Sequence, residues 1–201
     1  MFTRFSRVYK RLLFHSLGPM IPLGYFYKQV LPKPDYLQNK SVVSIFSVSG
    51  CISDDFCDYV NHWKHNKYWY FDSPELMNEI IEIENISTDN LKLFFYYAYE
   101  EQYDEVSKTW SPYPFEPSFS TNIKIPSSST FEGYDITSSS TGQFNECSPL
   151  SCNGLADEIP VNLNCLIPTL DEALELFRNN KLQGCEPGPY RVIEVHSVAR
   201  A

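Results

Sequence analysis

The chain lacks the long apolar run that a membrane-spanning helix requires. Such a helix needs about 20 consecutive residues that are predominantly apolar. The stretch 12–27 comes nearest, but polar residues and helix breakers interrupt it, namely His15, Ser16, Gly18, Pro19, Pro22 and Gly24. No small-residue cleavage pattern follows it, so it is also a poor secretory signal. We therefore expect no transmembrane segment and a cytoplasmic location.

The sequence also lacks the short motifs that mark common nucleotide-binding and hydrolytic sites. It contains no G-x-x-x-x-G-K-[ST] phosphate loop, no G-x-G-x-x-G fingerprint, no H-E-x-x-H or G-x-S-x-G motif and no calcium-binding loop. These nucleotide-binding and hydrolase classes therefore have no support in the sequence. We expect no cofactor, and the sequence assigns no catalytic residue.

Acidic residues are absent from the first 34 positions, although the chain as a whole is acidic. Those positions carry six basic residues, a formal charge of +6. Residues 35–201 carry all 25 acidic residues and the other 10 basic ones, a charge of −15, so the whole chain has a net charge of −9. A body this negative repels the phosphate backbone. We therefore expect no nucleic-acid binding through the acidic body and favour a basic protein partner.

Residues 1–16 have the pattern of a basic amphipathic helix. Arg4, Arg7 and Arg11 recur at helical spacing, and the apolar side chains occupy largely another stripe. Three interpretations stay open: a helix packed on the acidic body, an organelle-targeting presequence, or a segment in weak contact with a membrane surface. We expect residues 1–16 to be dispensable for folding and a chain that begins near Asp35 to unfold cooperatively.

The composition favours one domain with an appendage. A chain of 201 residues, 43% of them hydrophobic, can build one sizeable core. Four prolines between positions 19 and 39 predict a connector without a long regular element. We therefore divide the chain into a basic amphipathic segment with its connector, 1–34, and a single acidic α+β domain, 35–201.

The residue pattern predicts an α+β fold, in which helices cover a mixed or antiparallel sheet. β-branched and aromatic runs predict core strands that are neighbours in one sheet, at 41–48, 91–99 and 190–198, and another strand at 131–137. Helices are predicted at 74–84, where Ser73 is the cap, and at 170–179, where Thr169 and Glu172 match a capping box. Weaker patterns predict helices at 54–64 and after Ser148. A Pro/Ser-rich excursion with a short strand near 121–125 is predicted for 104–130.

Two cysteines five residues apart, Cys147 and Cys152, are the most suggestive candidates for chemistry. They could bind a metal if two further ligands came from Cys165, Cys185 or His196. Cys152 could also be a nucleophile near a helix N-terminus, with one of three histidines as its base, His62, His65 or His196. The simpler interpretation is that the cysteines are buried, reduced thiols. A second group, Cys51, Cys57, His62 and His65, matches no zinc spacing and is interpreted as an acidic, solvated helix face.

An aromatic segment supplies the candidate binding residues, Trp63, Tyr68, Trp69, Tyr70 and Asp72. Large amphipathic rings anchor many interfaces, but they also fill cores, and no periodicity here separates the two uses. Our favoured hypothesis is a non-enzymatic acidic binding or regulatory protein, of the inhibitor or immunity kind, that engages a basic macromolecular partner. The alternative is a thiol-dependent enzyme or a structural metal protein centred on Cys147 and Cys152.

Overall fold

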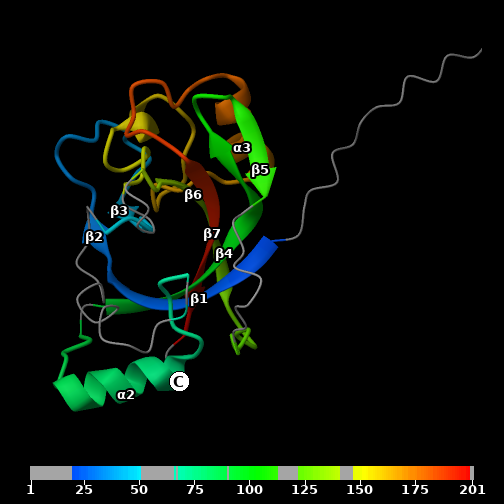
Figure 1. Ribbon diagram of the computed structural model, residues 1–201. Helices are drawn as coiled ribbons and strands as arrows, with labels where there is room; N and C mark the ends of the chain where they lie inside the picture. Colours follow the sequence, from blue (N-terminus) through cyan, green and yellow to red (C-terminus); the bar gives the residue numbers. More distant parts are fainter. Residues whose placement is uncertain are drawn as a thin grey trace, which may run out of the picture.

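The computed structural model describes residues 20–50, 66, 68–89, 91–112, 122–140 and 147–199. Its centre is an antiparallel sheet in which the long strands follow one another in the order β1–β4–β7–β6, while β5 pairs with the end of β4 (Figure 1). These strands are β1 (Met20–Gln29), β4 (Leu91–Asp104), β5 (Thr109–Pro112), β6 (Thr130–Ser138) and β7 (Tyr190–Val198). A separate short ladder joins β2 (Leu31–Pro32) to β3 (Ser44–Ile45).

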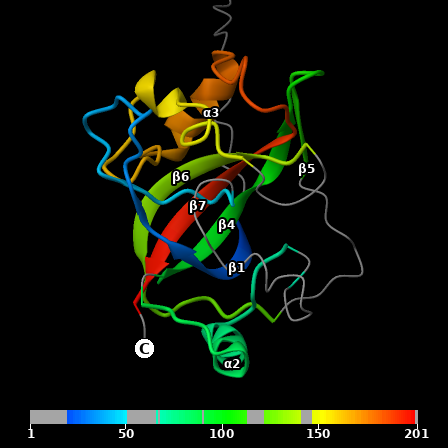
Figure 2. The same ribbon diagram turned by 90° about the vertical axis from the view of Figure 1, so that its left-hand side faces the viewer.

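The described chain contains two α-helices, and they lie at opposite ends of the molecule. Figures 1 and 2 show α2 (Pro74–Glu84) below the sheet, and Figure 2 shows α3 (Leu170–Arg178) above it. A 3₁₀ turn, η1 (Leu155–Asp157), lies in the segment before α3. No helix in the described ranges is long and apolar enough to cross a membrane.

The predicted fold class is wrong, because the described chain is mostly antiparallel sheet and two short helices do not cover it. Irregular backbone covers part of the sheet instead. Tyr134 and Ile167 exchange two backbone hydrogen bonds of 2.8 Å, and the Ser138 N–H donates to the Cys147 carbonyl at 2.8 Å. These contacts protect the edge strand β6 without a regular element. The helix expected after Ser148 is a series of turns that leads into η1.

Several predicted elements are confirmed together with their caps. The helix 74–84 has the predicted bounds, and the Ser73 hydroxyl accepts from the Leu76 N–H. Thr169 caps α3 in the same way through the Glu172 N–H. The segments 91–99 and 190–198 are adjacent strands, and the strand predicted at 131–137 lies within β6.

The predicted connector at 19–39 is wrong, since β1 occupies 20–29 and contributes buried side chains to the core. Pro22 is tolerated because β1 is an edge strand and Pro22 adjoins a bulge. Gly24, with a φ of +124°, follows Pro22 in this bulge. A Cβ atom there would lie 2.6 Å from the carbonyl oxygen of Phe71.

The strand predicted at 41–48 is wrong in a different way. Most of its apolar side chains are buried, although Val43 is 66% exposed, but only Ser44 and Ile45 are in a strand, and that strand is outside the main sheet. The backbone finds other partners: the N–H groups of Val43 and Ser44 both donate to the carbonyl of Leu163. The apolar run at 41–48 therefore reflects burial in the core and not pairing in the main sheet.

The excursion predicted at 104–130 is partly wrong, because β4 turns directly into β5 and forms a hairpin. Residues 122–125 are not in a strand. The helices predicted at 1–16 and 54–64 lie outside the described residues.

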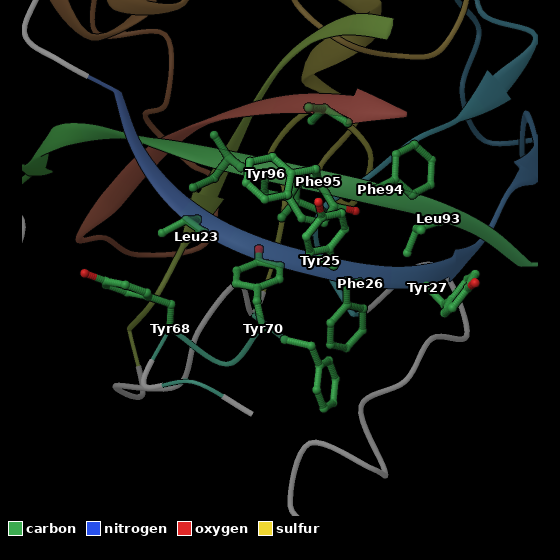
Figure 3. Packing of buried hydrophobic residues seen from close by; sticks show 14 of the residues in the cluster. Leu23, Tyr25, Phe26, Tyr27, Tyr68, Tyr70, Leu93, Phe94, Phe95 and Tyr96 are labelled. Atoms are coloured by element: carbon green, nitrogen blue, oxygen red, sulfur yellow. The ribbon is translucent and has the colours of Figure 1, made fainter. Parts of the chain in front are cut away.

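The core consists of two hydrophobic clusters. The first joins β1, β4 and α2 to the turn around Tyr70, and Figure 3 shows the rings that β1, β4 and this turn contribute to it. The second lies between the sheet, α3 and the 147–167 segment.

Candidate functional site

The segment 147–154, called the cysteine loop below, is a compact series of turns rather than a helix. The Cys152 N–H donates to the Ser148 carbonyl at 2.7 Å, and the Leu155 N–H donates to the Pro149 carbonyl at 3.1 Å. Cys152 therefore does not lie in the first turn of a helix, and the dipole expected to activate its thiol is missing there. The nucleophile hypothesis loses its main physical support.

Beneath this loop lies a fully buried carboxylate, Asp135 on β6. Its Oδ1 accepts hydrogen bonds from the Ser148 hydroxyl at 2.6 Å and the Ile136 N–H at 2.8 Å. Its Oδ2 accepts from the Val48 N–H at 2.8 Å and from the Ser47 hydroxyl at 3.3 Å. Burial raises the pKa of Asp135, while these hydrogen bonds oppose the rise. The carboxylate thus ties β6 to two irregular segments.

A buried lysine holds the same irregular segment from the other side. Lys28 on β1 is only 3% exposed, and its ammonium donates to the carbonyls of Val48 at 3.0 Å and Ser49 at 2.6 Å. Its charge also favours ionised Asp135. The network continues outward, since Ser151 donates to Ser47 and the Ser49 hydroxyl lies 3.7 Å from the Cys152 sulfur. Buried charges need such partners, so we interpret this network primarily as a clamp that orders the cysteine loop.

The described cysteines do not assemble a metal centre. Cys147, Cys152, Cys165 and Cys185 all remain thiols, and no group of three or more His, Cys, Asp or Glu side chains within the described ranges could hold a metal ion. Burial raises the pKa of the Cys165 thiol to about 12, and burial also raises that of Cys185. Their thiolate forms are therefore disfavoured at neutral pH. Cys51, Cys57, His62 and His65 lie outside the described residues.

His196 contacts a serine and a glutamate rather than a cysteine. Its Nε2 lies 2.5 Å from a Glu194 carboxylate oxygen, and its Nδ1 lies 3.1 Å from the Ser129 hydroxyl. Tyr134 donates to the other Glu194 oxygen at 2.9 Å. A carboxylate that orients an imidazole beside a hydroxyl is an arrangement able to accept a proton. The i, i+2 spacing of Glu194 and His196 on a strand was the sequence signal for it.

Three of the aromatic candidates, Tyr68, Trp69 and Tyr70, lie in one tight turn that gives their rings different exposures. Asn66 organises this turn, because its side-chain oxygen accepts from the N–H groups of Tyr68 at 3.0 Å and Tyr70 at 3.2 Å. Both tyrosines are buried, whereas Trp69 has a φ of 65° and is 39% exposed. Left-handed backbone is costly for a bulky residue. The turn therefore places one ring of the three at the surface.

Of the two remaining binding candidates, Asp72 and Trp63, the structure describes only Asp72. Asp72 accepts hydrogen bonds from the Asn66 side chain at 2.9 Å and the Asn122 N–H at 3.1 Å, so it anchors neighbouring backbone. Trp63 lies outside the described residues. Trp69 is thus the exposed member of the predicted set within the described chain, and α2 begins five residues after it.

Comparisons with known proteins add no relative, since no family model, no curated protein and no solved structure matches the chain.

Proposed function

We propose that this protein is a non-enzymatic binding protein that engages a basic protein partner, and that the outer face of α2 is part of the surface it uses. The proposal rests on one observation: α2 ends in exposed carboxylates that weaken the helix itself. Glu82, Ile83 and Glu84 are all exposed in its last turn, which contains no basic residue. The C-terminus of a helix carries partial negative charge, so acids there are unfavourable.

The start of α2 provides the contrast. The Ser73 hydroxyl, the local backbone N–H and Lys124 together hold the pKa of Glu75 at about 2. An acid in that first turn is favourable for the dipole. Within the described part of the chain, Glu82 and Glu84 have no comparable stabilising contact, and Ile83 is 62% exposed between them. Residues that cost stability without a structural benefit are typical of binding surfaces.

The charge of the chain favours the same type of partner. Residues 35–201 carry 25 acidic and 10 basic residues. A negative field of this kind speeds the association of a basic protein and weakens with salt. The exposed ring of Trp69 would add the apolar contact that hot spots require.

The experiment compares two double variants that lose the same charge. The full chain is immobilised, and proteins captured from a lysate of its source organism are identified by mass spectrometry at low and high salt. Glu82→Gln with Glu84→Gln should reduce capture of a specific basic protein about fivefold, since each exposed pair contributes up to about 1 kcal/mol. Asp171→Asn with Glu175→Gln on α3 should leave that capture within about twofold of the parent.

Stability supplies the second readout. The α2 double variant should have a higher urea midpoint than the parent. Its free energy of unfolding should rise by a few tenths of a kcal/mol for each carboxylate removed, because these charges no longer oppose the helix dipole. The α3 variant should lose a similar amount, since Asp171 lies in a first turn. The proposal is refuted if capture is insensitive to the α2 changes, or if both double variants weaken capture equally.

A further inference from the structure

A cavity of about 320 Å³ lies at the α3 end of the molecule, between the β4–β5 hairpin and the segment that follows α3. The hairpin contributes Glu105 and Val106, and the segment contributes Leu182 and Cys185. The volume is at the lower limit of small-ligand sites. Figure 2 shows α3 and the β4–β5 hairpin at the end of the molecule opposite α2, so the cavity is separate from the surface proposed above.

Aromatic rings line the base of the cavity. Tyr103 and Phe177 have ring centroids 4.9 Å apart, and Phe177 and Tyr190 have centroids 6.1 Å apart. The ring of Trp110 packs against Phe177 with a centroid distance of 4.8 Å. These contacts hold the rings in place before any ligand arrives. A preformed aromatic surface can bind an apolar chain or the face of a cation.

One carboxylate lines the cavity, and two more lie near it. Glu105 lines the cavity and adds to burial in raising the pKa of Tyr190, whose hydroxyl donates to the Glu186 carbonyl at 2.5 Å. Cys185, another lining residue, lies in the field of Glu158, Glu105 and Glu186. Lys108 is the basic side chain among the lining residues, and it is exposed at the hairpin tip. Glu105 and Lys108 balance each other within the lining, so the negative field near Cys185 comes from the neighbouring carboxylates of Glu158 and Glu186.

The rim of the cavity is built from constrained backbone. Lys108 and Asn180 have φ values of 56° and 55°, and Gly184 has a φ of 90°. At Lys108 and Asn180 this conformation is costly and persists only where the surrounding structure fixes it. The walls are therefore preorganised, which lowers the entropic cost of binding.

We propose that this cavity binds an alkylammonium group, with the apolar chain on the tyrosine and phenylalanine rings and the ammonium beside Glu105. Neutral alcohols and carboxylates of the same length lack the charge that this field attracts. The group could belong to a free amine or to a lysine side chain of a polypeptide. The site is independent of the α2 surface and does not require the proposed function to be correct.

The test is an NMR titration of the full chain with n-butylammonium, n-butanol and butyrate. Butylammonium should shift the amide signals of Glu105 and Leu182 and saturate, while butanol and butyrate should bind at least about tenfold more weakly. Nα-acetyl-lysine methylamide distinguishes the two sources, because it binds as tightly as butylammonium only if the rim admits a polypeptide backbone. Weaker binding of this compound assigns the site to free amines.

Matched variants locate the interaction. Glu105→Gln should weaken butylammonium binding about tenfold. The control is Glu101→Gln, which lies on β4 but does not line the cavity, and it should leave the affinity within about twofold of the parent. The unperturbed amide spectrum of each variant reports that the fold is intact. Equal binding of butanol, an unchanged affinity in Glu105→Gln, or the absence of binding would each overturn the proposal.

Discussion

The Ser148 hydroxyl donates to the Asp135 carboxylate across 2.6 Å, and this contact fixes the cysteine loop on β6. The same carboxylate accepts from the backbone N–H groups of Val48 and Ile136. One side chain on β6 therefore satisfies donors from its own strand and from two irregular segments, those of Val48 and Ser148. Its removal provides a direct test of the clamp.

Asp135→Ala should lower the free energy of unfolding by at least about 3 kcal/mol, because several buried donors lose their acceptor at about 1–3 kcal/mol each. Urea denaturation followed by fluorescence measures the loss. Asp89→Ala, at an exposed position, is the matched control and should stay within about 0.5 kcal/mol of the parent. A tolerant Asp135→Ala variant would show that the clamp contributes little.

The raised pKa of Asp135 makes a separate prediction about pH. Between the ordinary aspartate pKa, about 3.9, and the higher folded-state pKa, the folded chain binds more protons than the unfolded chain. Stability from this group is therefore greatest at acid pH and falls as pH rises through the folded-state pKa. Asp135→Asn removes the titration, so the difference in unfolding free energy, parent minus variant, should decrease with rising pH and then level off. An increase over that interval would mean that the folded-state pKa is lowered.

The position of β1 reverses one expectation from the sequence. A chain that begins at Met20 keeps this strand and should unfold cooperatively, with a midpoint close to that of the full chain. A chain that begins at Asp35 loses Leu23 and Phe26 from the first core cluster, and also loses Lys28 from the clamp. We expect that chain to be unfolded, since the loss exceeds the few kcal/mol that separate folded from unfolded domains. Far-UV circular dichroism and urea titration of both chains decide this, and a cooperative transition in the shorter one would contradict it.

Local signals in the sequence predicted the elements that have a helix cap or a continuous apolar run. Ser73 and Thr169 cap their helices as expected, and the apolar runs of β4 and β7 are adjacent central strands. The strand β1 was missed because Pro22 and Gly24 read as breakers, whereas a bulge at a sheet edge accommodates both. Such tolerance depends on a partner strand that is distant in sequence.

The candidate site was even less accessible to sequence reasoning. The sequence singled out Cys147 and Cys152 but predicted a helix after Ser148, where the structure has a series of turns. The buried Asp135 that organises these turns lies in a strand pattern without any local sign of its role. The cavity beside Glu105 depends on the approach of a hairpin and a loop that are about 70 residues apart in sequence. Only tertiary packing brings these groups together.

Thiol reactivity tests whether the cysteine loop has a chemical role beyond structure. Among the four cysteines in the described ranges, Cys152 should be alkylated fastest by iodoacetamide at pH 8, because it is partly exposed and Cys147 and Cys165 are buried. Cys165 should react slowest, since burial raises its pKa to about 12. Cys185 should also be slow, because burial and nearby carboxylates disfavour its thiolate.

Peptide mass spectrometry after timed alkylation gives the four rates, and the same reaction in urea gives the rate of an unfolded thiol. We expect Cys152 in the folded chain to react more slowly than it does in urea, because the turn places no described base beside its sulfur and the neighbouring group is the Ser49 hydroxyl. A Cys152 that reacts faster in the folded chain than in urea would require an activating group and would favour the thiol-enzyme alternative over the binding protein proposed here.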